Sequence, residues 1–298
     1  MNPAESSPEL SVVVIVLGGG SHLVRCLEAF ARQRAAPETE IIVPRDARVS
    51  DKDQESLCAL FPGVRFVPMG GAQTYAAMRA AGVKASRGKI VAITEDQCIP
   101  PESWCANVVT AHTAPHAAIG GPVDKLEPDT AINWSIYLRE LGTYMTPVQE
   151  GPSEALTDCN VSYKRAALED IADEWAEEFH EPGVHGALRR RGGTLWLSAG
   201  MLTYQQREIL FGPAIAERYA FGRLYGGQRV ARVSAGRRLV LIALSPLLPV
   251  VMVTRVLLGV LRKGRYIGPC LAAMPYLVLF AAVWSWGELV GYVTGRAK

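Results

Sequence analysis

The stretch Ser11-Val-Val-Val-Ile-Val-Leu17, followed by Gly18-Gly19-Gly20, decides the fold class of this 298-residue chain. A continuous run of β-branched residues is typical of a strand that is buried on both faces, as in a parallel sheet. Residues 22–34 come next and place apolar side chains at helical spacing. This order of strand and helix predicts an α/β fold with a mostly parallel sheet flanked by helices.

The same alternation continues outward from this stretch. In the first half of the chain, strands are predicted at 40–43, 64–67 and 89–94, and a helix at 74–85. The second half alternates less regularly, with strands predicted at 117–120 and 195–198 and helices at 165–171 and 185–191. Ligands of such sheets bind where the strands end. We therefore expect residues 18–20, Asp46 and residues 95–97 to converge on one crevice.

Charge and cysteine content exclude several classes of protein. The formal net charge of +2 is too small to predict binding to nucleic acid. The six cysteines show no CxxC pair and no zinc-like spacing, so we expect free thiols in a reducing compartment. Residues 1–9 are polar and lack a basic signal-like segment, which predicts a cytoplasmic location for the N-terminal domain.

The composition changes near residue 235, and we predict a first domain at 1–235 and a membrane-associated segment at 236–298. Residues 239–261 and 267–293 are apolar and long enough to span a bilayer, although prolines interrupt the first run. Buried core helices are the alternative. Basic residues flank both runs, which conflicts with a simple two-span hairpin and favours a re-entrant or interfacial first segment. These features predict attachment to the cell inner membrane.

The stretch KIVAITEDQCIPPESW, residues 89–104, carries the first chemical signal. A strand delivers two adjacent carboxylates, Glu95 and Asp96, to its end, and two prolines then turn the chain away. Such carboxylates can hold a divalent cation that neutralises a diphosphate. A solvated acidic loop explains the same pair equally simply.

Seven motifs in order resemble the family 2 inverting glycosyltransferases with the GT-A fold. They are the strand at 11–17, EIIVPRD at 40–46, AMRAAG at 77–82, EDQ at 95–97, IGGP at 119–122, NVSYKR at 160–165, and HE at 180–181 ahead of the basic LRRRG at 188–192. The resemblance covers roughly residues 10–235. It implies a sugar-nucleotide-binding domain of a membrane-anchored bacterial hexosyltransferase.

The resemblance also implies roles for individual residues. On the donor side it points to Asp46, Arg79, Glu95, Asp96 and Gln97, with Glu95 and Asp96 as the metal candidates. On the acceptor side it points to Trp104, Asn160 and His185, although His185 could equally be a helix-surface histidine. Glu181 falls where the family has its catalytic base, and an exposed loop acid is the alternative.

Departures from the family pattern leave the cofactor open. Gln97 replaces the third acid, and no histidine lies near residues 204–205, so a need for Mg²⁺ or Mn²⁺ is doubtful. Arg218, Arg223 or Arg229 could neutralise the diphosphate instead. The expected donor is a UDP-sugar, and the expected acceptor is a membrane lipid, a lipid-linked glycan or a polysaccharide.

Two other hypotheses compete. An NAD-binding Rossmann domain would use Gly18–Gly20, but Leu23 stands where that fingerprint requires its third glycine. A catalytically degenerate glycosyltransferase could bind a sugar nucleotide or a partner without turnover, and Gln97 with the missing histidine favours it. Nucleotide release from a panel of donors separates the active enzyme from the inactive module.

Overall fold

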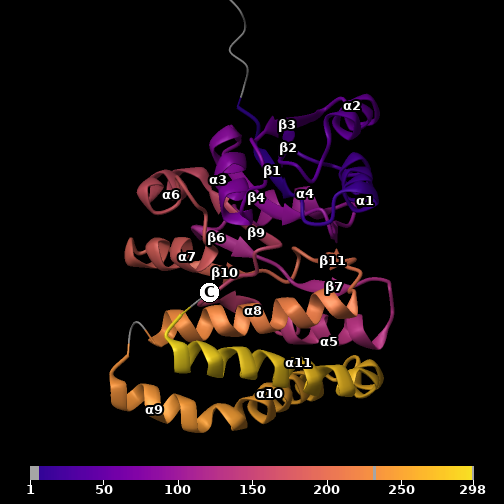
Figure 1. The fold of residues 1–298 in the computed structure, drawn as a ribbon. Coiled ribbons are helices and arrows are strands. Elements are labelled where there is room, and N and C mark those ends of the chain that lie inside the picture. Colours follow the sequence, from indigo (N-terminus) through magenta and orange to yellow (C-terminus); the bar gives the residue numbers. More distant parts are fainter. Residues whose placement is uncertain (1–6, 231–232, 297–298) are drawn as a thin grey trace, which may run out of the picture. The chain divides into compact units, whose positions relative to one another are not determined.

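The computed structural model describes residues 7–230 and 233–296, which form two compact units (Figure 1). The first unit contains the residues up to 126 and residues 144–206, and the second contains residues 127–143 and those from 207 onward. This division differs from the predicted boundary at residue 235, because the segments 127–143 and 207–230 group with the C-terminal helices. The functional domain boundary itself stays a prediction.

An eight-stranded sheet forms the centre of the first unit, in the order β3-β2-β1-β4-β9-β6-β10-β8. Strands β3, β2, β1 and β4 are parallel to one another, whereas β9 is antiparallel to both β4 and β6. The sheet is therefore mixed, and its first half confirms the predicted parallel alternation. The strands span Leu10–Ile15 (β1), Thr39–Arg45 (β2), Val64–Pro68 (β3), Ile90–Glu95 (β4), Ala118–Gly120 (β6), Gly151–Pro152 (β8), Asn160–Lys164 (β9) and Leu195–Leu197 (β10).

Helices cover both faces of this sheet, with α3 on one side of β1 and β4 and with α1 and α4 on the other (Figure 1). A second, three-stranded sheet has the order β5-β11-β7, with strands Cys98–Ile99, Thr203–Gln205 and Val123–Lys125. The helices of the first unit are Gly20–Ala31 (α1), Asp51–Leu60 (α2), Tyr75–Ala85 (α3), Trp104–Ala111 (α4), Arg165–Glu169 (α6), the 3-10 turn Ala172–Glu174 (η1) and Glu181–Arg190 (α7).

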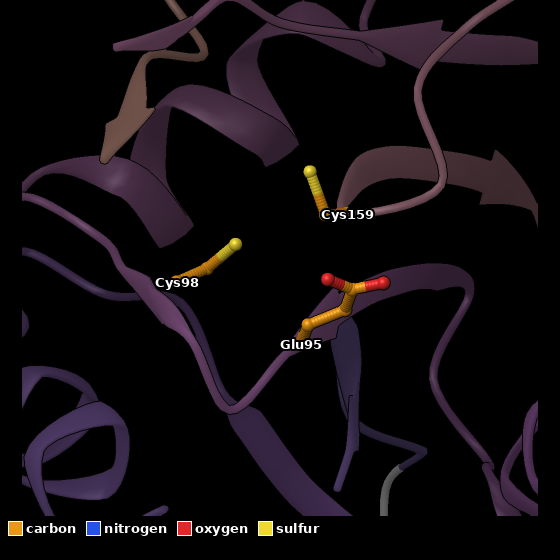
Figure 2. A group of neighbouring side chains, drawn as sticks. All are labelled: Glu95, Cys98 and Cys159. Atoms are coloured by element: carbon orange, nitrogen blue, oxygen red, sulfur yellow. The ribbon is translucent and has the colours of Figure 1, made fainter. Parts of the chain in front are cut away.

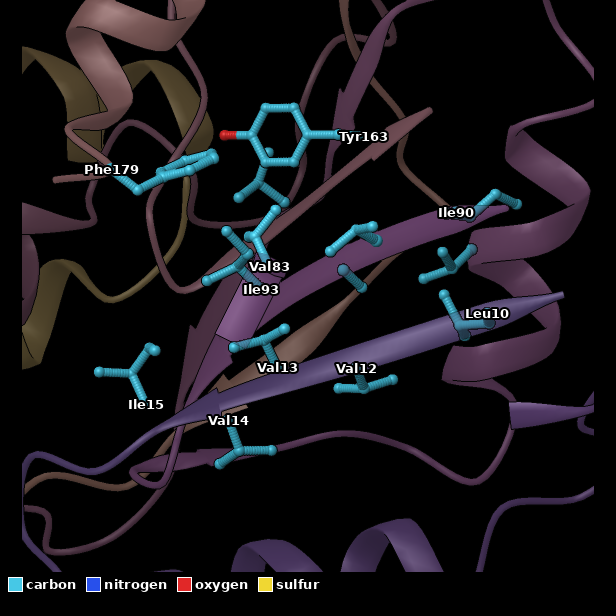
Figure 3. Close-up of a cluster of buried hydrophobic side chains, with 14 of the residues drawn as sticks. Leu10, Val12, Val13, Val14, Ile15, Val83, Ile90, Ile93, Tyr163 and Phe179 are labelled. Carbon is cyan, nitrogen blue, oxygen red and sulfur yellow. The ribbon is translucent and has the colours of Figure 1, made fainter. Parts of the chain in front are cut away.

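The main hydrophobic core lies on both faces of β1, every residue of which is buried. Val13 and Val14 point to opposite faces of the strand, and Ile93 of β4 and Val83 of α3 lie near Val13 (Figure 3). A Cβ at Gly82 of α3 would come within 2.2 Å of the Val13 side chain, so this helix packs with its backbone against the strand. This close packing fixes the position of α3, which carries Arg79.

The second unit is helical. Its central helix α11 lies side by side with α8, and it also contacts α5 and α10 (Figure 1). Glycines on both helices allow the crossing of α8 and α11, since a Cβ at Gly226 or Gly287 would lie within 2.3 Å of a backbone oxygen of the other helix. The elements are Ala131–Glu140 (α5), Phe211–Val230 (α8), Ala235–Leu244 (α9), the 3-10 turn Ser245–Leu247 (η2), Leu248–Lys263 (α10) and Ile267–Thr294 (α11).

Two helical segments of the described residues, 235–263 and 267–294, have the length and hydropathy to cross a membrane. Their mean hydropathies are 2.2 and 1.8, and only 6% of the first apolar window is buried, against 28% of the second. The prolines of the first segment act as predicted, because η2 separates α9 from α10 at Pro246. How these segments lie in a membrane stays a prediction.

Candidate active site

The carboxylate of Asp96 closes the loop after β1. It accepts hydrogen bonds from the backbone N–H groups of Leu17 (3.0 Å), Gly18 (3.0 Å) and Gly19 (2.6 Å), and its side chain is buried. Burial raises the pKa of Asp96, and the N–H donors oppose this shift. The N–H groups of this glycine loop therefore bind a side chain of the protein itself. In an NAD-binding Rossmann domain they would bind the pyrophosphate, so this arrangement counts against that hypothesis.

Asp46 and Gln97 lie around the same loop, as the sequence predicts. Asp46 follows β2 and accepts from the backbone N–H groups of Gln73 and Arg48 (both 2.9 Å). Burial alone would raise the pKa of Asp46, but these bonds and the Arg48 guanidinium outweigh it and lower the pKa. The Gln97 side chain lies near Gly18, and its buried amide oxygen has no hydrogen-bond partner in the described part of the chain. This oxygen is free to accept from a ligand.

Arg79 connects the donor side to the start of α7. Its guanidinium lies 2.7 Å from Glu181, 3.1 Å from Asp158 and 3.5 Å from Glu95, measured between nitrogen and carboxylate oxygen. The Arg79 side chain is only 8% exposed, so these contacts are largely shielded from solvent. Two of the three predicted acids, Glu95 and Glu181, thus share one buried cation although they are distant in sequence.

Glu181 is the first residue of α7, where Pro182 follows it. Its side chain is 12% exposed, so the alternative of an exposed loop acid is wrong. Burial raises the pKa of Glu181 to about 7, against the opposing effect of Arg79. A carboxyl group with this pKa can exchange a proton near neutral pH, as a general base requires.

The three acceptor-side candidates lie in the interior of the first unit. Trp104 donates its indole N–H to the side-chain oxygen of Asn160 at 3.0 Å, and Asn160 donates to the backbone oxygens of Pro122 and Met201. His185 is buried on α7 and lies 3.0 Å from the hydroxyl of Tyr163. A helix-surface position for His185 is therefore wrong. Burial lowers the pKa of His185 to about 4, so its ring is neutral at pH 7.

Glu95 also faces two buried thiols, those of Cys98 and Cys159 (Figure 2). Their ligand atoms all lie within 4.8 Å of one another, which is compact enough to hold a metal ion. One carboxylate and two thiols suit a soft cation better than Mg²⁺ or Mn²⁺, which prefer oxygen ligands. Because the oxygens of Asp96 are engaged by N–H groups, the predicted pair of Glu95 and Asp96 does not fit a hard cation.

The arginines predicted to neutralise a diphosphate belong to the second unit. Arg218 of α8 forms ion pairs with Glu140 (2.5 Å) and Glu217 (3.0 Å). Arg223 lies one turn further along, and Arg229 donates to the hydroxyl of Tyr292 at 3.1 Å. Their role toward a donor stays a prediction.

Asp158 and the two thiols are the site residues that the sequence did not reveal. Asp158 precedes the NVSYKR motif at the start of β9, and its side chain is 49% exposed beside the buried Arg79. The strand β9 that follows it begins beside the end of β4, where the EDQ motif lies, so its place just before NVSYKR could have identified it. The thiols carried no such signal, because Cys98 and Cys159 are brought together only by the contact of their loops.

Comparisons with known proteins bear on the family and the fold of this chain. The family described as glycosyl transferase family 2 matches residues 11–172, which is more than half of the chain but ends before Glu181. No curated protein sequence matches significantly. Among solved structures, GalNAc-T7 with UDP, GalNAc and Mn²⁺ superposes with a TM-score of 0.52 at 15% identity, covering 69% of this chain and 45% of that chain.

A second solved structure, residues 1–349 of TarS from S. aureus, has a TM-score of 0.49 at 12% identity and covers 76% of this chain and 66% of that chain. This chain thus spans less than half of GalNAc-T7 and about two thirds of the TarS fragment. The likeness to GalNAc-T7 shows a GT-A-like fold and no more. By the extent of the family match, the chain belongs to glycosyl transferase family 2.

Proposed function

We propose that this protein is a membrane-associated inverting glycosyltransferase that moves a sugar from a nucleotide-sugar donor to an acceptor hydroxyl. The observation that carries the proposal is the buried Arg79, which holds Glu181 of α7 and Glu95 of the β4 end within 3.5 Å of one guanidinium. In an inverting transfer, one carboxylate must act beside the donor site. The shared cation supports assigning the family's base position and its donor-side strand end to one site.

Glu181 is the proposed general base. It removes the proton from the acceptor hydroxyl as the oxygen attacks the anomeric carbon, while the bond to the nucleotide diphosphate breaks on the opposite face. The Arg79 contact orients the carboxylate, and burial keeps its pKa near 7, so that it can accept a proton at neutral pH. We propose that Asp46 and Gln97 bind the donor. We also propose that the buried Trp104, Asn160 and His185 support the acceptor side of the site from the protein interior.

The proposed donor is a UDP-sugar, and the charge of its diphosphate must be neutralised by a cation. GalNAc-T7 carries UDP and Mn²⁺ in its solved structure, which supports a UDP-sugar and makes a divalent cation plausible for this chain too. The residues present fit Mg²⁺ or Mn²⁺ poorly, since Asp96 is engaged by three N–H groups and Gln97 replaces an acid. We therefore expect arginines, with Arg218 and Arg223 as candidates, to neutralise the diphosphate.

The acceptor and the location are inferred from the apolar helices. Segments 235–263 and 267–294 could anchor the chain in the inner membrane, with the first unit in the cytoplasm. A membrane lipid, a lipid-linked glycan or a growing polysaccharide would then meet the enzyme in the same layer. Tethering raises the effective concentration of such an acceptor.

One observation favours the inactive alternative. The closest charged partner of Glu181 is a cation at 2.7 Å, and both carboxylate oxygens of Asp96 already accept hydrogen bonds from three backbone N–H groups. A catalytically degenerate domain would keep the fold and bind a sugar nucleotide without turnover. This alternative makes a different prediction in the same assay.

The test is nucleotide release from a panel of UDP-sugars, with the full chain in lipid or detergent and with or without Mg²⁺ or Mn²⁺. We expect release from at least one donor, with Glu181→Gln losing it while donor binding persists. Glu177→Gln serves as the matched control, because Glu177 is an exposed acid of the segment just before α7. Donor binding by the unmodified chain without turnover on any donor would favour the degenerate module.

A further inference from the structure

A cavity of about 500 Å³ opens within the second unit, between α5 and α10. Four cationic side chains line it, and no carboxylate is among the described lining residues. The cations are Arg139 at the end of α5 and Arg255, Arg262 and Lys263 on α10. A volume of this size is typical of sites for small molecules and head groups.

Two of these cations, Arg255 and Arg262, lack the counter-charges that other arginines of the unit have. Within residues 7–230 and 233–296, Arg255 and Arg262 form no ion pair or hydrogen bond through their side chains. Glu140, the nearest acid in sequence to Arg139, is engaged instead by Arg207 (3.2 Å) and Arg218 (2.5 Å). Arg255 and Arg262, which are both exposed, therefore have no counter-charge within the described chain.

The pKa of Arg139 reflects the positive charges that lie near it. Burial lowers its pKa, and the guanidinium groups of Arg218 and Arg255 lower it further, although Glu140 and Glu288 act in the opposite direction. Its guanidinium also lies over the Trp284 ring, 5.7 Å from the ring centre. An anion in the cavity would relieve the repulsion between the cations.

The dipole of α10 accounts for only some of the cations that line the cavity. Arg262 and Lys263 lie in the last turn of α10, where cations favour the helix dipole. Lys263 is also bonded to the backbone oxygen of Thr143 at 2.9 Å. Arg255 lies in the interior of the same helix, in a segment apolar enough to cross a membrane. A charge at such a position is expensive unless it faces a polar or charged partner.

The apolar surroundings identify the kind of anion. Leu138 and Val256 line the cavity beside the arginines, and Val251 and Leu258 of α10 are 41% and 45% exposed. A ligand with one anionic group and a hydrocarbon chain matches both features, because the charge enters the cavity while the chain follows the helix. We propose that this cavity binds the phosphate group of a membrane lipid.

This proposal rests on the proposed attachment of the second unit to a membrane and does not depend on sugar transfer. It is therefore tested by binding, without donor or turnover. The full chain, purified in a neutral detergent, is titrated with short-chain phosphatidylglycerol and, in a second arm, with inorganic phosphate. We expect the lipid to bind and inorganic phosphate to bind at least about tenfold more weakly, because it lacks the apolar chain.

Two kinds of variant locate the binding. Arg139→Gln with Arg255→Gln should weaken lipid binding by about tenfold or more, whereas Arg237→Gln with Arg296→Gln, which removes two exposed arginines outside the cavity, should leave it unchanged. Gly259→Leu keeps every charge and narrows the cavity, and a Cβ there meets no atom within 4 Å, so the helix should tolerate it. It should weaken lipid binding as well.

Three results would overturn the proposal. Equal losses in the cavity pair and the control pair would indicate attraction by general surface charge. Unchanged binding in Gly259→Leu would place the lipid elsewhere. Inorganic phosphate binding as tightly as the lipid would make the cavity a site for free phosphate. Circular dichroism of each variant separates a loss of binding from a loss of fold.

Discussion

In the first unit the buried guanidinium of Arg79 contacts three carboxylates, whereas in the second unit Arg255 and Arg262 contact no carboxylate of the described chain. Arg79 is buried, whereas Arg255 and Arg262 are exposed on a helical segment apolar enough to cross a membrane, and only the first site supplies the counter-charge from within. A buried ion needs a partner, and so does a charge on a helix that lies in a membrane. The difference indicates that the first site is organised by the protein itself, while the cavity of the second unit is completed by a ligand.

The two units also differ in how their backbones pack. In the first unit, side chains on both faces of β1 fill the core. In the second unit, α8 and α11 approach so closely that Gly226 and Gly287 leave no room for a Cβ. Side-chain cores tolerate changes of volume better than contacts between backbones do. A substitution that enlarges a side chain should therefore be tolerated better in the core of the first unit than at the α8–α11 crossing of the second.

The largest effect is expected from Glu181→Gln, which removes the proposed base from the paired site of the first unit. The rate of nucleotide release should fall about a thousandfold, because an amide cannot accept the hydroxyl proton. Stability should change little, since Asp158 and Glu95 still contact Arg79. Single-turnover assays measure the rate, and Glu177→Gln should match the unmodified chain. Full activity in Glu181→Gln would remove Glu181 from the mechanism.

The next effect concerns backbone packing in the second unit. Gly287→Leu should destabilise the protein by about 3 kcal/mol, because the new Cβ would lie 2.2 Å from the backbone oxygen of Tyr219. Gly236→Leu is the control, since a Cβ at that position meets no atom within 4 Å. Thermal unfolding in detergent reports the difference. Equal melting temperatures for the two variants would show that the α8–α11 crossing is looser than described.

The sequence predicts the first unit well because its elements are local patterns. The β-branched run at 11–17 and the strand at 89–94 each indicate a buried strand without reference to any other residue, and both are confirmed as β1 and β4. The convergence of Asp96 with the glycine loop follows from the general geometry of parallel sheets. These parts of the site needed no knowledge of side-chain packing.

The remaining parts depend on contacts that no local pattern encodes. The salt bridge between Arg79 and Glu181 requires the start of α7 to reach α3, and the sequence motif at 180–181 does not show this. The segment 127–143 joins the C-terminal helices only through tertiary packing, so the predicted boundary at 235 differs from the compact units.

A smaller loss of stability is expected from Arg79→Lys. This variant tests whether the first unit depends on pairing three carboxylates with one planar guanidinium. An ammonium group cannot hold Glu181, Asp158 and Glu95 in the same way, so stability should fall by about 2 kcal/mol. Chemical denaturation measures this loss. Arg65→Lys is the control, because its pair with Glu40 involves an arginine that is 43% exposed and should contribute little. Equal losses in both variants would contradict a special role for burial at Arg79.

The smallest effect is the pH dependence of Glu181, in which activity and stability should move in opposite directions. Its folded pKa of about 7 lies above the ordinary value of 4.5, so its protonated form stabilises the fold at low pH. That contribution is complete below about 4.5 and is lost as the pH rises through 7. The base must be ionised to act, so the rate should fall by about tenfold per pH unit below 7 and level off above it. Rate profiles and denaturation curves from pH 5 to 9 check the direction of both changes. A rate that is flat between pH 5 and 7 would show that the Glu181 carboxyl is already ionised or is not the base.

Arg79→Lys should move the midpoint of the rate profile to higher pH, because the less well-placed cation attracts the Glu181 carboxylate less. A midpoint that does not move would mean that burial alone sets the pKa of Glu181.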